Sequence, residues 1–233
     1  MSSRLRFPVL AGLLILFPTV LLDANPPHNW HSHADVVRKV TDLYKKMKSY
    51  RAEFQIQTPK KTMTGTASYL NPGKVRFDFS NPAGDMLLSD GKVLWIVISR
   101  LNVIGRQDLE LDQKDENGNR IFAVMPGSGI DRLFRKYHYR FAGLEQPRKV
   151  DGKDYFVLEL EQKEKIGGYT QMTLYINSQT YLIEKAEAID SLDGKTMIQF
   201  RNIRPDEPLD GKLFQYSPPD TQRVVYNPLV SEE

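Results

Sequence analysis

Three histidines near the amino terminus are the first side chains whose type and spacing suggest chemistry. His28, His31 and His33 carry imidazole nitrogens, which are common ligands of transition metals. A metal site also requires a fold that holds its ligands in a fixed geometry, and these residues lie in a leader that precedes the first regular element. We therefore expect solvated histidines, with a structural or adventitious metal as the alternative.

A second candidate for chemistry is the serine of Gly127-Ser128-Gly129. A nucleophile elbow needs the pattern Gly-x-Ser-x-Gly between a strand and a helix, which this segment lacks, so we expect a flexible helix entry. The chain has no cysteine. Gly167-Gly168 is not followed by the residues that complete a phosphate-binding loop. We predict no catalytic residue, no metal site and no cofactor. These absences disfavour an enzyme, so we expect a protein that is not an enzyme, and a binding function follows by elimination.

Composition limits the class of protein and the kind of partner. The chain has 233 residues, of which 40% are hydrophobic, enough to bury a sizeable core. A mean hydropathy of -0.45 excludes a polytopic membrane protein. The net charge of +3 comes from 32 basic and 29 acidic residues, a balance that does not indicate a nucleic-acid partner. Since no repeat or linker divides the chain, we expect a single domain over 25–233, as a monomer.

The first residues follow the order of a secretory signal. Arg4 and Arg6 precede an uncharged apolar run over 7–22, which ends near Ala24. The run contains two prolines and is short for a membrane span, which needs about 20 apolar residues. We expect a signal peptide over 1–24, cleaved after Ala24, with an uncleaved anchor as the alternative. The mature protein would be exported.

The elements that must position a binding site begin with an amphipathic helix. Ser32 and Asp35 form a helix start of the Ser-x-x-Asp kind. Six apolar residues then recur at helical spacing, which predicts a helix with one buried face. They are Val36, Val37, Val40, Leu43, Tyr44 and Met47. A second, short helix is expected over 130–135.

After Tyr50 the period of the pattern changes from helical to two. Alternation around Phe54 and Phe77 predicts half-buried antiparallel strands, and further strands are expected over 154–161, 170–177, 182–189 and 196–203. Residues 93–98 are apolar without alternation, which indicates a strand covered on both faces. The chain is therefore α+β, with a single curled antiparallel sheet wrapped over helices and a concave apolar face. Turn signals lie at Asn71-Pro72-Gly73, Asp90-Gly91, Asn117-Gly118, Asp151-Gly152 and Asp193-Gly194.

Two segments carry a resemblance to a known family. Residues 69–79 read Tyr-Leu-Asn-Pro-Gly-Lys-Val-Arg-Phe-Asp-Phe, and residues 89–96 read Ser-Asp-Gly-Lys-Val-Leu-Trp-Ile. This order of a proline-led strand and a Ser-Asp-Gly-Lys hairpin resembles the outer-membrane lipoprotein carrier family, LolA-type. The resemblance implies a half-open β-barrel covered by helices, with a helical lid. It also implies a periplasmic protein that carries acylated lipoproteins from an inner-membrane lipoprotein-releasing transporter to an outer-membrane acceptor.

The resemblance also suggests how the lid is held. Well-known family members carry an arginine just before the strand-leading proline, and this residue helps to hold the lid. In this sequence that position is Asn71, and Arg76 on the following strand is the nearest basic group. Asn71 and Arg76 are therefore the candidate latch.

A carrier of acyl chains needs a large apolar surface without demanding polar partners. Exposing such a chain to water is unfavourable by about 0.8 kcal/mol per CH₂, or about 12 kcal/mol for a palmitoyl-length chain. Ordinary core packing is the alternative role for each lining residue, and the register leaves open which of Leu94, Trp95 and Ile96 faces the groove. We expect the short helix to act as a lid, with a rigid structural helix as the alternative. The predicted acyl-chain-binding residues are Phe54, Phe77, Phe79, Leu88, Trp95, Val97, Leu133 and Phe134.

Two other classes of function stay open at this point. A periplasmic domain of the same fold that senses lipids or lipoproteins without carrying them would use the same apolar face. A secreted enzyme or an adhesion module is the third class.

Overall fold

The computed structural model of the protein describes residues 31–109, 128–164 and 168–226. The expected signal peptide over 1–24, His28, and the turn at Asn117-Gly118 lie outside these residues. Within the described ranges, no helix has the length and apolar character needed to cross a membrane.

The first helix, α1 (His33–Lys46), forms as its sequence pattern predicts. The Ser32 side chain accepts a hydrogen bond from the Asp35 backbone N–H, which caps the helix. Val36 and Val40 are fully buried. The backbone N–H of Ile183 donates to the Tyr44 hydroxyl at 3.1 Å, so the helix is also tied to a distant strand.

In the described part of the chain, thirteen strands form one sheet, which is larger than the sequence pattern predicts. The sheet is almost wholly antiparallel, and only β13 pairs with β6 in parallel. The strands are β1 (Ser49–Gln57), β2 (Thr62–Leu70), β3 (Lys74–Asn81), β4 (Met86–Ser89), β5 (Val93–Ile98), β6 (Val103–Asp108), β7 (Tyr137–Phe141), β8 (Arg148–Val150), β9 (Lys153–Gln162), β10 (Tyr169–Asn177), β11 (Ile183–Asp190), β12 (Lys195–Pro205) and β13 (Arg223–Tyr226).

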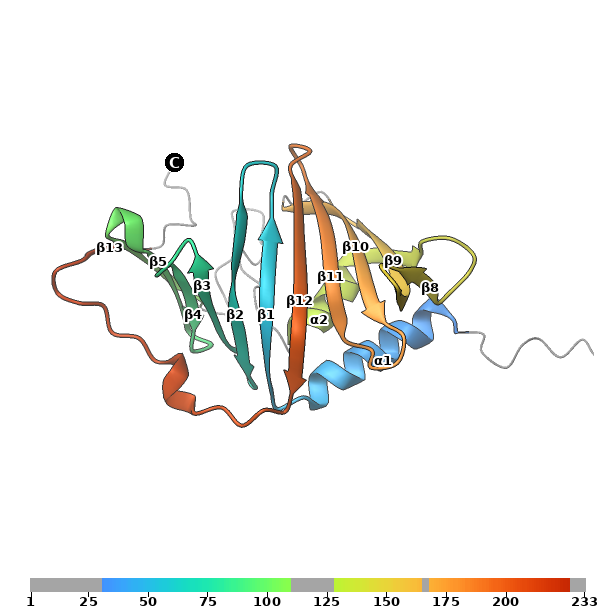
Figure 1. The fold of residues 1–233 in the computed structure, drawn as a ribbon, viewed down its shortest axis with the longest axis horizontal. Coiled ribbons are helices and arrows are strands. Elements are labelled where there is room, and N and C mark those ends of the chain that lie inside the picture. Colours follow the sequence, from blue (N-terminus) through green and yellow to red (C-terminus); the bar gives the residue numbers. More distant parts are fainter. Residues whose placement is uncertain (1–30, 110–127, 165–167, 227–233) are drawn as a thin grey trace, which may run out of the picture. The chain divides into compact units, whose positions relative to one another are not determined.

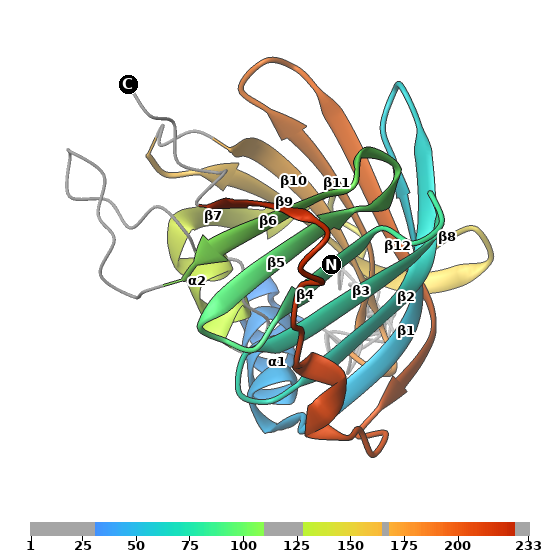
Figure 2. The same cartoon turned by 90° about the vertical axis from the view of Figure 1, so that its left-hand side faces the viewer.

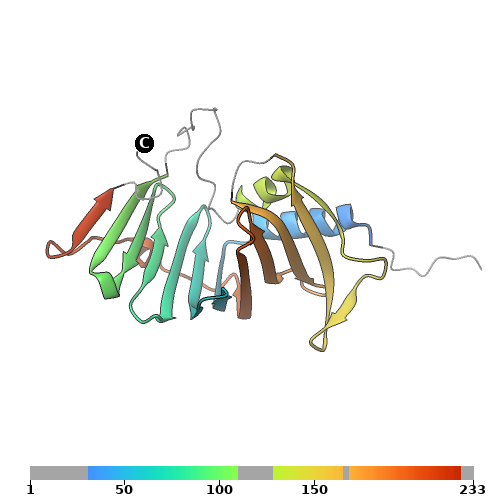
Figure 3. The same ribbon diagram turned by 90° about the horizontal axis from the view of Figure 1, so that it is seen from above.

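The sheet is open, and its order explains which strands are neighbours (Figures 1 and 3). The path runs β13-β6-β5-β4-β3-β2-β1-β12-β11-β10-β9-β7, and β8 pairs with β9 beside this path. The described helical cover is smaller than expected. It consists of α1, α2 (Ser128–Lys136) and the short 3-10 turns η1 (Ser99–Leu101) and η2 (Gly211–Phe214).

Following the register from strand to strand places a continuous set of apolar side chains on one face of the sheet. Alternate residues of a strand share a face, and directly paired residues of neighbouring strands lie on the same face. We call this surface the apolar face. It comprises Phe156, Leu158, Leu160, Met172, Leu174, Ile176, Ala186, Ala188, Ile198, Phe200, Ala52, Phe54, Ile56, Ala67, Phe77, Phe79, Leu87, Leu94 and Ile96.

The two α-helices cover only one part of the apolar face. Val36, Val40 and Phe134 pack in one core cluster with residues of β9 and β10, such as Leu158 and Leu174. Figures 2 and 3 show both helices beside the half of the sheet formed by β7 and β9–β12. Beneath the helices the apolar residues of β9 and β10 are almost fully buried, because the helices exclude water from them. They are Phe156, Leu158, Leu160, Leu174 and Ile176.

The opposite face of the other half is covered by the last part of the chain. After β12 the chain passes through η2 and continues in front of β3–β5 to β13 (Figure 2). Phe214 is fully buried, and Tyr216 and Val224 pack against a cluster formed by β4, β5 and β6. This cover comes from residues more than a hundred positions away in the sequence.

Candidate functional site

An aromatic cluster forms the centre of the apolar face. The rings of Phe77 and Phe79 each lie 5.1 Å from the ring of Phe54, edge to face. Gly65 stands beside Phe54 on β2, and a Cβ added there would overlap the carbonyl oxygen of Asp78 and lie 2.8 Å from the tip of the Phe54 ring. The missing side chain of Gly65 therefore makes room for the three rings.

The apolar face continues from this cluster along β4 and β5. Leu87 pairs directly with Phe77 and with Ile96, and Leu94 lies two residues from Ile96 on the same face. Phe77, Leu87, Leu94 and Ile96 are all only half-buried. This part of the face thus presents accessible apolar surface, in contrast to the part beneath the helices.

The structure does not bring the eight predicted acyl-binding residues together. Phe54, Phe77 and Phe79 lie on the apolar face, but Leu88, Trp95 and Val97 point to the opposite face, where Leu88 is fully buried. Leu88 and Val97 form a core cluster against which Trp95 packs, and the Trp95 ring contacts Tyr216 at 5.5 Å between centroids. The register reverses the assignment within β5, because the neighbours Leu94 and Ile96 are the residues that share the face of Phe77.

The two predicted residues of the short helix lie at the helix-covered part of the apolar face. Phe134 is buried, with 7% of its surface exposed, and its ring lies 5.6 Å from that of Tyr139. Leu133 is half-buried against the same core cluster. Lys45 of α1 pairs with Asp131 of α2 at 3.1 Å, so the two helices are also joined by charge. The mobile lid stays a prediction.

The candidate latch residues bind other parts of the chain than the short helix. The Asn71 side chain donates to the carbonyl oxygen of Met47 at 3.3 Å, directly after α1. The Arg76 guanidinium donates to the Leu213 carbonyl at 2.9 Å and pairs with Asp78 at 2.7 Å. Arg76 therefore fastens the C-terminal segment to β3, on the face opposite to the helices.

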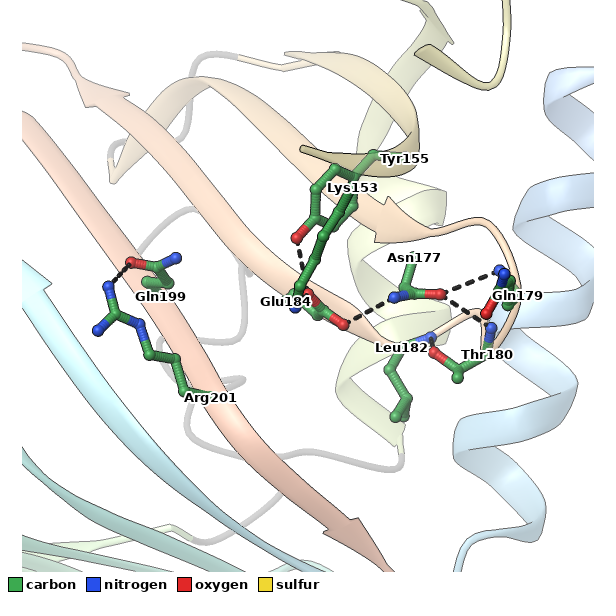
Figure 4. A network of polar contacts seen from close by, with 9 residues as sticks. All are labelled: Lys153, Tyr155, Asn177, Gln179, Thr180, Leu182, Glu184, Gln199 and Arg201. Carbon is green, nitrogen blue, oxygen red and sulfur yellow. Dashed lines mark hydrogen bonds and ion pairs between the residues drawn. The ribbon is translucent and has the colours of Figure 1, made fainter. Parts of the chain in front are cut away.

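A carboxylate with three hydrogen-bond partners lies on the face opposite to α1 (Figure 4). Glu184 accepts hydrogen bonds from the Tyr155 hydroxyl at 2.7 Å, from Lys153 Nζ at 2.9 Å and from Asn177 Nδ2 at 2.8 Å. Burial alone would raise the pKa of Glu184, but the three hydrogen bonds together hold that pKa below its ordinary value. Its charge is satisfied by these partners, so the arrangement joins β9, β10 and β11 rather than offering a free acid or base.

Of the two leader histidines in the described part of the chain, His33 is exposed as expected and His31 is not fully solvated. His31 is half-buried, with its ring 4.9 Å from Phe156, and the His33 ring lies 5.6 Å from Tyr139. Over the described part of the chain, no three metal-ligating side chains form a group.

A cavity of about 790 Å³ near one end of the strands was not foreseen from the sequence. Its lining is mixed, with Met172 and Ile189 beside the Arg140–Glu159 ion pair, whose atoms are 3.0 Å apart. No local sequence pattern indicates it, because its lining comes from six strands.

Comparisons with known proteins agree with this architecture. The chain is 29% identical over 113 residues to the outer-membrane lipoprotein carrier protein of Leptothrix cholodnii, covering 45% of this chain and about half (51%) of that relative. It is 24% identical over 203 residues to the carrier protein of Pseudomonas paraeruginosa, covering 83% of this chain and 90% of the relative. An uncharacterized conserved protein from Thermus thermophilus has a similar fold, with a TM-score of 0.53 at 14% identity, over 81% of this chain and 98% of that one.

The family assignment rests on a longer stretch of sequence than the two motifs. Residues 45–217 match the sequence model described as "Outer membrane lipoprotein carrier protein LolA". This range runs from the end of α1 to the C-terminal segment that covers β3–β6. The chain therefore belongs to the LolA family.

Proposed function

We propose that the protein is a periplasmic carrier that binds the acyl chains of lipoproteins on its apolar face and shuttles them from the inner to the outer membrane. The observation that supports this most is the half-exposed part of the apolar face, over β3, β4 and β5. In this proposal an inner-membrane lipoprotein-releasing transporter supplies the cargo and an outer-membrane acceptor receives it.

The chemistry of this surface suits a saturated chain. The side chains on it are aromatic and aliphatic, and they make contacts that do not depend on hydrogen-bond geometry. Each CH₂ group moved from water to such a surface contributes about 0.8 kcal/mol, so a palmitoyl-length chain gains about 12 kcal/mol if it is fully covered. A surface of this kind binds chains of different length and position.

The proposed contact residues follow the register. Phe77, Phe79, Leu94 and Ile96 offer accessible apolar surface, and Phe54 supports the two phenylalanine rings from below. Leu133 and Phe134 border the same face at α2, where the predicted lid would begin. Leu88, Trp95 and Val97 are left out, because they pack beneath the C-terminal segment.

A substitution pair on one strand tests the proposed face. Ile96→Gln places an amide on the apolar face, whereas Val93→Gln, three residues earlier, places the same group on the opposite face of β5. Burying an unpaired amide against an acyl chain is unfavourable by about 1–3 kcal/mol, so we expect Ile96→Gln to weaken binding of a synthetic diacylated lipopeptide about tenfold.

The control variant Val93→Gln should bind within about twofold of the parent, with folding of both variants checked by circular dichroism. Equal loss of affinity in the two variants, or none in either, would contradict the assignment of the face.

A domain that senses lipids or lipoproteins is the alternative, and a transfer experiment separates it from a carrier. A carrier should release an acylated lipoprotein from inner-membrane vesicles into solution and hand it to outer-membrane vesicles. A sensor would bind the lipopeptide without completing the transfer. Lipopeptide binding with no transfer would therefore favour the sensing domain.

A further inference from the structure

Exposed large apolar side chains gather at one end of the sheet. Among the described residues, five such side chains are exposed, and three of them lie at the same end of the strands, in turns or at a strand start. Leu192 is 89% exposed at the tip of the β11–β12 hairpin, Leu101 is 52% exposed in η1, and Tyr169 is 40% exposed at the start of β10. Single exposed leucines are common on protein surfaces, but their concentration at one end is not explained by packing.

Strand pairing shows that the β1–β2 and β11–β12 hairpins are neighbours. Gln57 pairs with Met197, so the β1–β2 and β11–β12 hairpins project from the same end of the sheet (Figures 1 and 2). Tyr169 pairs with Asp190, directly beside the second hairpin.

The β11–β12 turn holds Leu192 in an ordered position. The Asp190 side chain accepts hydrogen bonds from the backbone N–H groups of Leu192 and Gly194, both at 2.8 Å. Asp193 has a positive φ of 61°, as a tight turn at this position requires. The apolar side chain is therefore presented to solvent by a structured turn.

Three exposed lysines lie on the same two hairpins as this apolar side chain. Lys60 and Lys61 are exposed at the tip of the β1–β2 hairpin, whose turn carries no acidic residue, and Lys195 is exposed where β12 begins. Asp190 is engaged with the backbone of its own turn, and Asp193 is the exposed carboxylate on the β11–β12 tip. The two tips together thus combine an exposed leucine with three lysines.

We propose that the two hairpin tips, residues 58–61 and 191–195, dock the protein on a bilayer that contains anionic phospholipids. Leu192 enters the interface between head groups and acyl chains, while Lys60, Lys61 and Lys195 meet lipid phosphates. A protein partner would instead require a contiguous apolar patch at its centre, and here the two tips offer a single exposed leucine among lysines. The inference goes beyond the proposed function, because it concerns the surface that meets the membrane and requires no cargo.

Vesicle binding by the full chain tests this proposal. The parent should sediment with vesicles of phosphatidylcholine and phosphatidylglycerol, and much less with phosphatidylcholine alone. Each lysine near an anionic surface contributes about fivefold, or about 1 kcal/mol, so the double variant Lys60→Glu/Lys61→Glu should lose at least about tenfold in binding. Leu192→Ser should lose several-fold.

Two control variants lie at the other end of the sheet. Leu144 is fully exposed in the loop between β7 and β8, and Lys149 is exposed on β8. Leu144→Ser and Lys149→Glu should bind anionic vesicles like the parent. Absence of parent binding to both kinds of vesicle, as expected if the tips meet an acidic protein, would overturn the proposal, and so would equal losses in the controls.

The same variants distinguish membrane docking from cargo binding. The tip variants should bind the diacylated lipopeptide like the parent, and Ile96→Gln should bind anionic vesicles like the parent. If Ile96→Gln abolished vesicle binding, the chain would be extracting lipid onto its apolar face, and the docking assignment would be wrong.

Discussion

Replacing Phe134 by alanine tests whether α2 is a fixed part of the core or a lid. In the structure Phe134 is 7% exposed and belongs to the cluster that contains Val36 and Val40 of α1 and Leu158 of β9. Removing a buried phenylalanine ring lowers the free energy of unfolding by about 3–5 kcal/mol. The favourable transfer of the ring from water to the core is lost, and a cavity is left behind. This is a large part of the roughly 5–15 kcal/mol that stabilises a typical domain.

Urea unfolding and thermal unfolding, both followed by circular dichroism, measure this loss. For a domain of this size each kcal/mol lowers the melting temperature by about 2–4 °C, so the packed arrangement predicts a decrease of about 6–20 °C. Leu133→Ala is the matched variant one residue earlier. Because Leu133 is half-buried, its loss should be smaller.

A lid would give the opposite pattern. If α2 opens readily, both variants should unfold at nearly the parent urea concentration, because little of their packing would be permanent. Weaker closure would increase the fraction of molecules competent to bind, so the lipopeptide should bind more tightly. A loss below about 1 kcal/mol in Phe134→Ala, with faster hydrogen exchange confined to 128–136, would refute the reasoning from the core cluster.

Two further predictions concern the sheet. Gly65→Ala should lower the free energy of unfolding by about 1–3 kcal/mol and weaken lipopeptide binding, because the added methyl group would displace the Asp78 carbonyl or the Phe54 ring; an unchanged urea midpoint would contradict this packing. Glu184 has a pKa that is lowered in the folded state, so its charge stabilises the fold above the ordinary value of 4.5 and this contribution is lost as the pH falls through the lower folded value. Glu184→Gln should therefore be less stable near neutral pH and lose less stability on acidification, and parallel curves of urea midpoint against pH would argue against the network.

Elements with a strong period of apolar residues could be predicted from the sequence. The helix from Ser32 to Met47 and the strand around Phe54 are confirmed, and the four later strands lie within a few residues of their predicted limits. In these segments the local period of apolar residues identifies the buried face, because one side of the element packs on the core and the other is in water.

Strand β2 shows why one strand of the apolar face was not predicted. Its sequence, Thr-Met-Thr-Gly-Thr-Ala-Ser-Tyr-Leu, has small residues at the positions that face the aromatic cluster. Gly65 and Ala67 are small there because the rings from β1 and β3 occupy the space above them. The large apolar residues that cover β2 belong to its neighbouring strands. The sequence of β2 alone therefore does not show the alternation of a strand.

Strand β5 shows why the predicted acyl-binding residues fall on both faces of the sheet. Its six residues are all apolar, so the pattern alone does not distinguish the face of Trp95 from the face of Ile96. The expectation of cover on both faces holds in full only for Val97, because the other five residues are half-buried.

The distinction between the two faces of β5 comes from the far end of the chain. Tyr216 and Val224 pack against the cluster on the Trp95 face, and the Arg76–Leu213 hydrogen bond fastens their segment to β3. The C-terminal segment thus gives one apolar face of β5 a permanent partner and leaves the other half-exposed. A strand that is apolar on both faces can then belong both to the core of the sheet and to the half-exposed apolar face on which acyl binding is proposed, and the segment after β12 decides which face is which.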